Sequence, residues 1–184
     1  MFKNVIVYRI GAGWSATLAQ MEEGLDPARF VECGASQERS IGWSEPRGEA
    51  NGPLLEAVAG QWILKLMTET RALPASVVNR KAQERVAQIE ASTGRKPGKK
   101  ETRDLKDDIR LELLPMAFTK QSSTTVWIDR DAQVLVTDAG SQARADELVT
   151  LLVQSLPGLA LTLVNTETMR RFHAYQPIGH GRAG

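Results

Sequence analysis

Two helical patterns separated by a Gly/Pro-rich break occupy the middle of this 184-residue chain, between Pro74 and Pro115. Proline suits the first helical position, so Pro74 is expected to open the first helix. The residue before a proline disfavours helical geometry, so Pro115 is expected to end the second. Apolar residues recur at helical spacing in both segments: Val78, Ala82, Val86 and Ile89, then Leu105, Ile109 and Leu113. With Gly94, Pro97 and Gly98 at the break, the pattern predicts a helical hairpin.

The hairpin is also the most basic part of the chain. Residues 80–106 have a net charge of +5, the whole chain has +1, and everything outside the segment therefore has −4. Clustered positive charge on an otherwise acidic protein is the pattern expected of a phosphate-backbone binder, and a solvated connector between two helices is the alternative. The candidate binding residues are the nine cations Arg80, Lys81, Arg85, Arg95, Lys96, Lys99, Lys100, Arg103 and Lys106.

Strand patterns flank the hairpin on both sides, which indicates an α+β fold with mixed or antiparallel sheets, packed helices and a protruding basic helical hairpin. Runs rich in β-branched and aromatic residues predict strands, namely 3–10, 30–33, 54–59, 61–70, 124–129, 133–137 and 159–164. Ser15 is expected to cap a helix ending at Gly24, and Ser141 a second one with Ala145, Leu148, Leu152 and Leu156 on its apolar face.

These elements suggest one interrupted domain. We expect residues 1–73 to form its first part, 74–116 the helical excursion and 117–168 its second part. Residues 169–184 show no periodicity and are expected to form a poorly ordered tail.

Composition limits the classes of protein that remain. The hydrophobic content of 42% is ordinary for a globular protein, and no apolar run approaches the roughly 18 residues of a membrane span. The N-terminus lacks the organisation of a signal peptide. The single cysteine, Cys33, cannot form an internal disulfide, which fits a reducing cytoplasm.

No constellation of catalytic residues emerges. Both histidines, His173 and His180, lie in the tail without the spacing of a zinc site. The turn at Gly11 and Gly13 lacks the third glycine of a dinucleotide-binding motif. Neighbouring carboxylates such as Asp107 and Asp108 point in different directions on a helix, which disfavours a shared metal ion. We therefore expect a protein that is not an enzyme and that uses no cofactor or metal.

A second polar stretch follows the hairpin, in residues 118–123. Lys120 and Gln121 lie there among Ser and Thr hydroxyl groups, which are good phosphate partners. They are further candidates for DNA binding, and a polar lead-in to the next strand is the alternative.

Several stretches together resemble the bacterial recombination-associated protein RdgC family. They are residues 2–9 (FKNVIVYR), Gly42-Trp43, residues 105–108 (LKDD), and residues 113–118 (LLPMAF) followed by Trp127-Ile128-Asp129. The resemblance runs in consistent order from Met1 to about Thr168. It implies a nucleoid-associated protein that binds single- and double-stranded DNA with little sequence preference.

The resemblance further implies a homodimer that closes a positively charged ring around duplex DNA and restrains RecA-driven strand exchange. It implies no cofactor, small-molecule substrate or membrane partner. Family members carry a further C-terminal part that helps to close the ring. This sequence stops at Gly184 with an atypical tail, so an open dimer or a monomer is the alternative to a closed ring.

The alternative function is a protein-interaction or dimerisation module whose basic hairpin docks an acidic partner.

Overall fold

The computed structural model describes residues 5–164. Within this range the chain forms four α-helices and a seven-stranded sheet, so the α+β prediction is confirmed. The strand order is β2-β4-β5-β6-β1-β7, with β3 paired to β4. The strands are β1 (Ile6–Ile10), β2 (Arg39–Ser44), β3 (Leu55–Val58), β4 (Gln61–Ala72), β5 (Phe118–Asp129), β6 (Val134–Thr137) and β7 (Leu161–Leu163).

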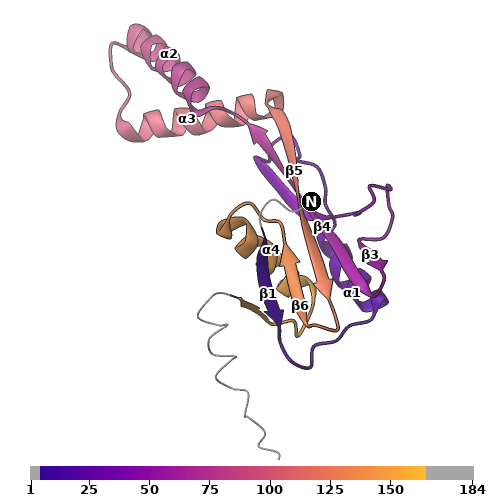
Figure 1. Cartoon of the computed structure of the whole chain (residues 1–184). Helices are drawn as coiled ribbons and strands as arrows, with labels where there is room; N and C mark the ends of the chain where they lie inside the picture. Colours follow the sequence, from indigo (N-terminus) through magenta and orange to yellow (C-terminus); the bar gives the residue numbers. More distant parts are fainter. Residues whose placement is uncertain (1–4, 165–184) are drawn as a thin grey trace, which may run out of the picture. The chain divides into compact units, whose positions relative to one another are not determined.

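The helices are α1 (Leu18–Leu25), α2 (Ala75–Thr93), α3 (Lys99–Leu113) and α4 (Gln142–Ser155), with short 3₁₀ turns at Asp26–Ala28 and Leu114–Met116. Figure 1 shows their order along the chain. No helix among the described residues has the length and apolarity needed to cross a membrane. The expected tail at 169–184, with both histidines, lies outside these residues.

The chain divides into two compact units. The first contains the segments up to Arg29, Trp43–Leu66, and everything from Thr124 onward, while the second contains Phe30–Gly42 and Met67–Ser123. Strands β2, β4 and β5 each contribute residues to both units.

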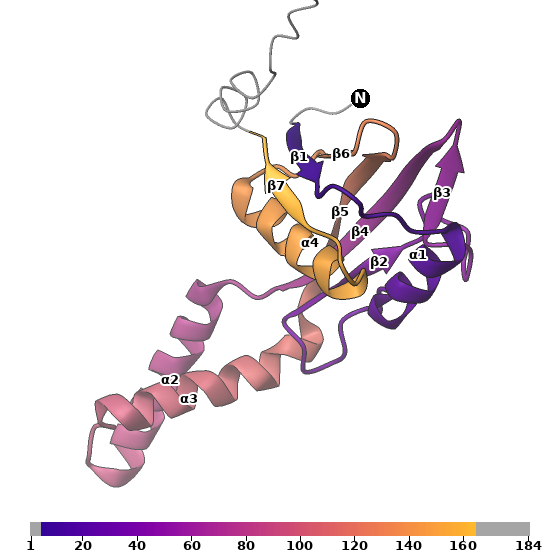
Figure 2. The same cartoon turned by 90° about the horizontal axis from the view of Figure 1, so that it is seen from below.

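The first unit holds the larger apolar core. Trp43, Trp62, Met21, Leu64 and Leu148 are all almost fully buried there. Ser141 is the N-cap of α4, and its hydroxyl accepts a hydrogen bond from the Arg144 N–H at 3.3 Å. The four apolar residues predicted for this face are all buried. The capping and burial predictions for α4 are therefore confirmed. Figure 2 shows α4 beside β1 of the same unit.

The strands predicted at 54–59 and 61–70 are present as β3 and β4, and they pair as an antiparallel hairpin. Val58 pairs with Gln61, and the two intervening residues, Ala59 and Gly60, both have positive φ angles (49° and 83°). This is the left-handed geometry of a type I′ turn, whose twist matches that of the strands and which glycine adopts without strain.

Helix α1 differs from its prediction at both ends. Its N-cap is Thr17 and not Ser15, because Thr17 and Gln20 form a reciprocal capping box. Gly24 does not end the helix but lies within it, where a β-carbon would come within 2.4 Å of the Ser155 carbonyl oxygen. Glycine at this position permits the close approach of α1 and α4.

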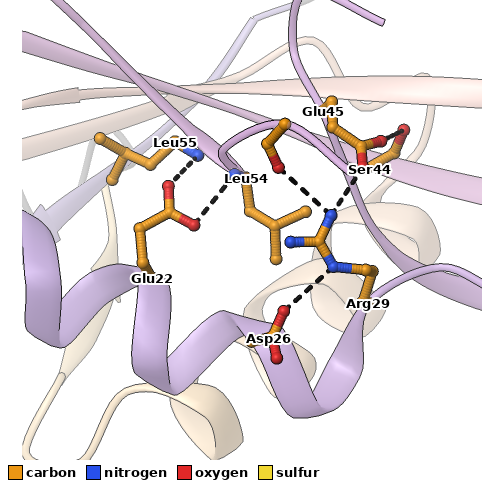
Figure 3. Close-up of polar contacts among 8 residues, drawn as sticks. Glu22, Asp26, Arg29, Ser44, Glu45, Leu54 and Leu55 are labelled. Atoms are coloured by element: carbon orange, nitrogen blue, oxygen red, sulfur yellow. Dashed lines mark hydrogen bonds and ion pairs between the residues drawn. The ribbon is translucent and has the colours of Figure 1, made fainter. Parts of the chain in front are cut away.

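Polar contacts hold α1 and the turn that follows it to the β2–β3 connection (Figure 3). The two oxygens of Glu22 accept the N–H groups of Leu54 and Leu55 at 3.0 and 2.8 Å. Arg29 contacts Glu45 at 2.6 Å and Asp26 at 3.0 Å. The contacts of Glu22 and the Arg29–Glu45 pair are partly buried, and they fix a Gly- and Pro-rich connection that has little secondary structure of its own.

Two strand predictions were wrong. Residues 30–33 form no strand, because the Cys33 N–H is bound by a carboxylate instead of a neighbouring strand. Strand β5 starts at Phe118 and not at Thr124, so the polar stretch with Lys120 and Gln121 is part of a strand.

Candidate nucleic-acid interface

The candidate interface is built on α2 and α3, the two helices of the hairpin, which a short connection joins (Figure 1). A small apolar cluster joins them: Val78, Ala82, Ile109 and Leu113 are buried against one another. Val86, Ile89 and Leu105, the other residues predicted for these faces, are half-buried. The periodicity therefore predicted the contacting faces correctly.

The ends of the two helices follow from local sequence. Pro74 is the N-cap of α2, one position before its predicted place. Gly94 ends α2 with a positive φ of 68°, the conformation that favours glycine at a helix C-terminus. Pro97 and Gly98 then lead into α3, whose first residues are Lys99 and Lys100. Helix α3 ends at Leu113, before Pro115.

The predicted cations fall into two groups. Three arginines are paired with acids of the hairpin itself: Arg80 with Glu84 at 4.0 Å, Arg85 with Glu112 at 3.0 Å, and Arg95 with Glu101 at 3.0 Å. The other six form no ion pair with any described residue: Lys81, Lys96, Lys99, Lys100, Arg103 and Lys106. All six are exposed or half-buried.

Lys120 and Gln121 lie on β5, where neighbouring side chains alternate between faces. Both residues are exposed. The Gln121 amide donates to the Glu69 carboxylate at 3.2 Å, so this side chain is engaged in a contact within the second unit. Lys120 forms no ion pair among the described residues and remains a candidate cation.

Glu69 on β4 is the centre of a polar network that sequence reasoning missed. It is 3% exposed, and its carboxylate accepts the Cys33 N–H at 2.5 Å. The pKa of Glu69 is lowered, chiefly because this N–H stabilises the charged form, while burial acts in the opposite direction. Burial is also the main reason why the pKa of the Cys33 thiol is raised, and the nearby Glu69 carboxylate adds to it.

Arg71, two residues further along β4, connects the base of the hairpin to the loop before β2. Among the described residues, its guanidinium donates only to backbone carbonyl oxygens, at 3.1–3.5 Å. The acceptors are Cys33, Gly34, Leu114, Pro115 and Ala117. The sequence shows that residues 68–71 (TETR) are polar, but no pattern in it indicates which groups Glu69 and Arg71 contact.

Large apolar side chains are exposed close to the same base. Leu111 is 59% exposed, Met116 68% and Phe118 86%. They lie within eight residues of each other, from the end of α3 to the start of β5. Exposed apolar residues grouped in this way often mark an interaction surface.

A cavity of about 600 Å³ lies between α1 and α4 in the first unit. Glu23 is the one ionisable residue among those that line it. Across residues 5–164, no three histidine, cysteine or acidic side chains gather in a set that could hold a metal ion.

Comparison with known proteins identifies the family. The family described as "RdgC: Putative exonuclease, RdgC" matches residues 1–173, so the chain belongs to the RdgC family and the resemblance seen in the sequence is confirmed. The relative from Herminiimonas arsenicoxydans is 42% identical over 160 residues, which cover 87% of this chain and 53% of the relative. The relative from Dechloromonas aromatica is 38% identical over 166 residues, covering 90% and 54%.

A third relative, from Bordetella pertussis, is 41% identical over 162 residues, which cover 87% of this chain and 53% of the relative. All three are named recombination-associated protein RdgC. The chain therefore spans about half the length of the curated relatives it matches.

Proposed function

We propose that this chain binds DNA without sequence specificity and thereby modulates DNA recombination, by occupying DNA and restraining RecA-driven strand exchange. The observation that carries the proposal is the group of six cations on the α2–α3 hairpin that no acid of the described chain neutralises. They belong to a segment with a net charge of +5 in a chain that is otherwise acidic. The recombination-associated names of the relatives support the same function.

The residues of the hairpin determine the kind of binding we propose. The segment 74–116 contains no aromatic residue, so it has no platform on which bases could stack. Lys and Arg on an exposed helix pair contact phosphates, which are the same in every sequence and in single- and double-stranded DNA. The protein would act as a homodimer, in the cytoplasm and associated with the nucleoid, without a cofactor.

A titration with random-sequence duplex at several salt concentrations tests the proposal, with sedimentation of the same sample to determine the oligomeric state. Each phosphate neutralised contributes about −0.9 to the slope of log K against log salt, so six cations give a slope of up to about −5. Duplexes of different sequence should give the same affinity. A failure to bind at low salt would refute the proposal for this chain.

The family description raises the possibility of DNA cleavage, and we propose binding without it. End-labelled duplex incubated with the protein and Mg²⁺ is expected to keep its full length over many hours at saturating protein. Progressive shortening, abolished by EDTA, would instead support an exonuclease.

The exposed apolar residues favour a second candidate, a dimerisation or protein-interaction module whose basic hairpin docks an acidic partner. Leu111, Met116 and Phe118 offer apolar area that is largely uncovered within the second unit. Sedimentation of a Phe118→Ser variant distinguishes the two roles. If the chain is a dimerisation module, the variant should lose a self-association that is insensitive to salt. If the chain only binds DNA, the variant should have the oligomeric state of the wild type.

A further inference from the structure

The six unpaired cations of the hairpin do not share one surface. In α3, Lys99, Arg103, Lys106 and Arg110 follow one another at intervals of four, three and four residues. At 3.6 residues per turn, this spacing places them within a sector of roughly 60° around the helix axis. We call these four residues the α3 stripe.

The opposite side of α3 is acidic. Asp104, Asp108 and Glu112 are centred roughly 170° from the stripe by the same helical geometry. Glu112 forms the 3.0 Å pair with Arg85 of α2, so Arg85 lies against the acidic side of α3. The buried residues Ile109 and Leu113 lie between the two sides. The acids of α3 are thus turned away from the stripe, and one of them, Glu112, is paired with Arg85.

Three members of the α3 stripe are available to an external anion. Lys99 and Arg103 are exposed, Lys106 is half-buried, and none forms an ion pair within the described part of the chain. The fourth, Arg110, contacts Asp107 at 3.0 Å and Glu38 at 3.5 Å. The free part of the stripe is thus Lys99, Arg103 and Lys106.

The length of this free part suits a nucleic-acid backbone. Seven residues of helix rise about 10.5 Å, and successive phosphates of one DNA strand advance about 3.4 Å along the duplex axis. Helix α3 laid along one strand therefore places three cations beside about three phosphates. Lys and Arg side chains are long enough to adjust to the remaining differences in spacing.

We infer, on the basis of the proposed DNA binding, that Lys99, Arg103 and Lys106 form one continuous phosphate-binding surface among the six unpaired cations and that Arg80, Arg85 and Arg95 do not contribute. The distance across the hairpin supports this division. A helix with its side chains is about 10 Å wide, and the Debye length at physiological salt is about 8 Å. DNA on the α3 stripe is therefore screened from Arg85 on the acidic side of α3, and Arg80, Arg85 and Arg95 each pair with an acid of the hairpin.

Two triple variants with the same change in net charge test the inference. K99Q/R103Q/K106Q removes the free stripe, and R80Q/R85Q/R95Q removes three paired cations. Duplex titrations over a range of salt should show a slope smaller by about 2.7 for the stripe variant, with an affinity on the order of a hundredfold lower at 0.15 M salt. The matched control should keep the wild-type slope within about 0.5 and lose less than about threefold in affinity.

Equal losses in the two triple variants would overturn the inference while leaving DNA binding intact, because they would show that only the total charge matters. No binding by the wild-type protein would overturn the proposed function and this inference together. A charge-retaining variant, K99R/R103K/K106R, should bind like the wild type, and helical circular dichroism should be unchanged in all three. If the stripe variant loses helicity, R103Q alone should lower the slope by about 0.9, and an unchanged slope would refute the role of Arg103.

Discussion

Arg71→Ala is expected to destabilise the protein more than the loss of any cation on the hairpin surface. The Arg71 guanidinium donates to five carbonyl oxygens, and three of these hydrogen bonds, to Cys33, Leu114 and Ala117, are partly buried. They join the loop before β2 to the connection between α3 and β5, two segments that are about 80 residues apart in the sequence.

The magnitude follows from the three partly buried bonds. A hydrogen bond contributes about 1 kcal/mol net, and one from a charged donor contributes about 1.5–3 kcal/mol. The distances of 3.1–3.3 Å and the partial access of water favour the lower figure. Arg71→Ala should therefore lower the free energy of unfolding by about 3 kcal/mol. Arg71→Lys, which keeps the charge but not the planar array of donors, should lose about half as much.

Urea denaturation followed by circular dichroism measures this difference, with tryptophan fluorescence as a check that one transition describes the whole chain. Arg95→Ala is the matched control, because it removes an arginine whose one ion pair, with Glu101, is largely exposed. Such a pair contributes about 0–1 kcal/mol. If Arg71→Ala costs no more than Arg95→Ala, the carbonyl contacts do not stabilise the protein and the reasoning fails.

Three further variants or measurements test other parts of the structure. Ile109→Ala should cost about 2–4 kcal/mol in urea unfolding because Ile109 is buried between the two helices, whereas the exposed Leu111→Ala should cost less than about 0.5 kcal/mol. The pKa of Glu69 is lowered, so its charged form stabilises the fold at pH values above 4.5, the ordinary pKa of a glutamate. The difference in unfolding free energy between the wild type and Glu69→Gln should therefore shrink as the pH falls below 4.5. A difference that does not change with pH would contradict this. The Cys33 thiol, buried and with a raised pKa, should react with a thiol reagent at pH 8 far more slowly in the native protein than in urea, and equal rates would show that it is exposed.

The parts of the fold that the sequence predicted well depend on interactions between near neighbours. The faces of α2 and α3 follow from periodicity, the break between them from Gly94, and the β3–β4 turn from Gly60. The family resemblance was likewise readable, because it lies in short contiguous stretches. In each case the residues that form the helix face, the break or the turn lie within a few positions of one another in the sequence.

The prediction of α1 shows how local sequence signals for the ends of a helix can be misread. Ser15 is a good N-cap by type, but Thr17 has Gln20 three residues later and completes a capping box. Gly24 looks like a helix end, and it is instead a point of close approach to Ser155, 131 residues away. No local pattern distinguishes these two uses of glycine.

The candidate site was predicted only as a sum of charges, and its organisation depends on contacts that the sequence does not display. Arg85 and Glu112 are 27 residues apart, and their pairing places Arg85 against the acidic side of α3. Gln121, a candidate for phosphate binding, donates a hydrogen bond to Glu69, 52 residues away, and nothing in the sequence indicated that contact. A count of lysines and arginines thus predicts that a surface can attract DNA, but the acids that each cation meets in the folded chain decide where DNA can bind. For this reason two variants of equal charge, one in the α3 stripe and one among the paired arginines, give more information about this protein than the removal of all its cations together.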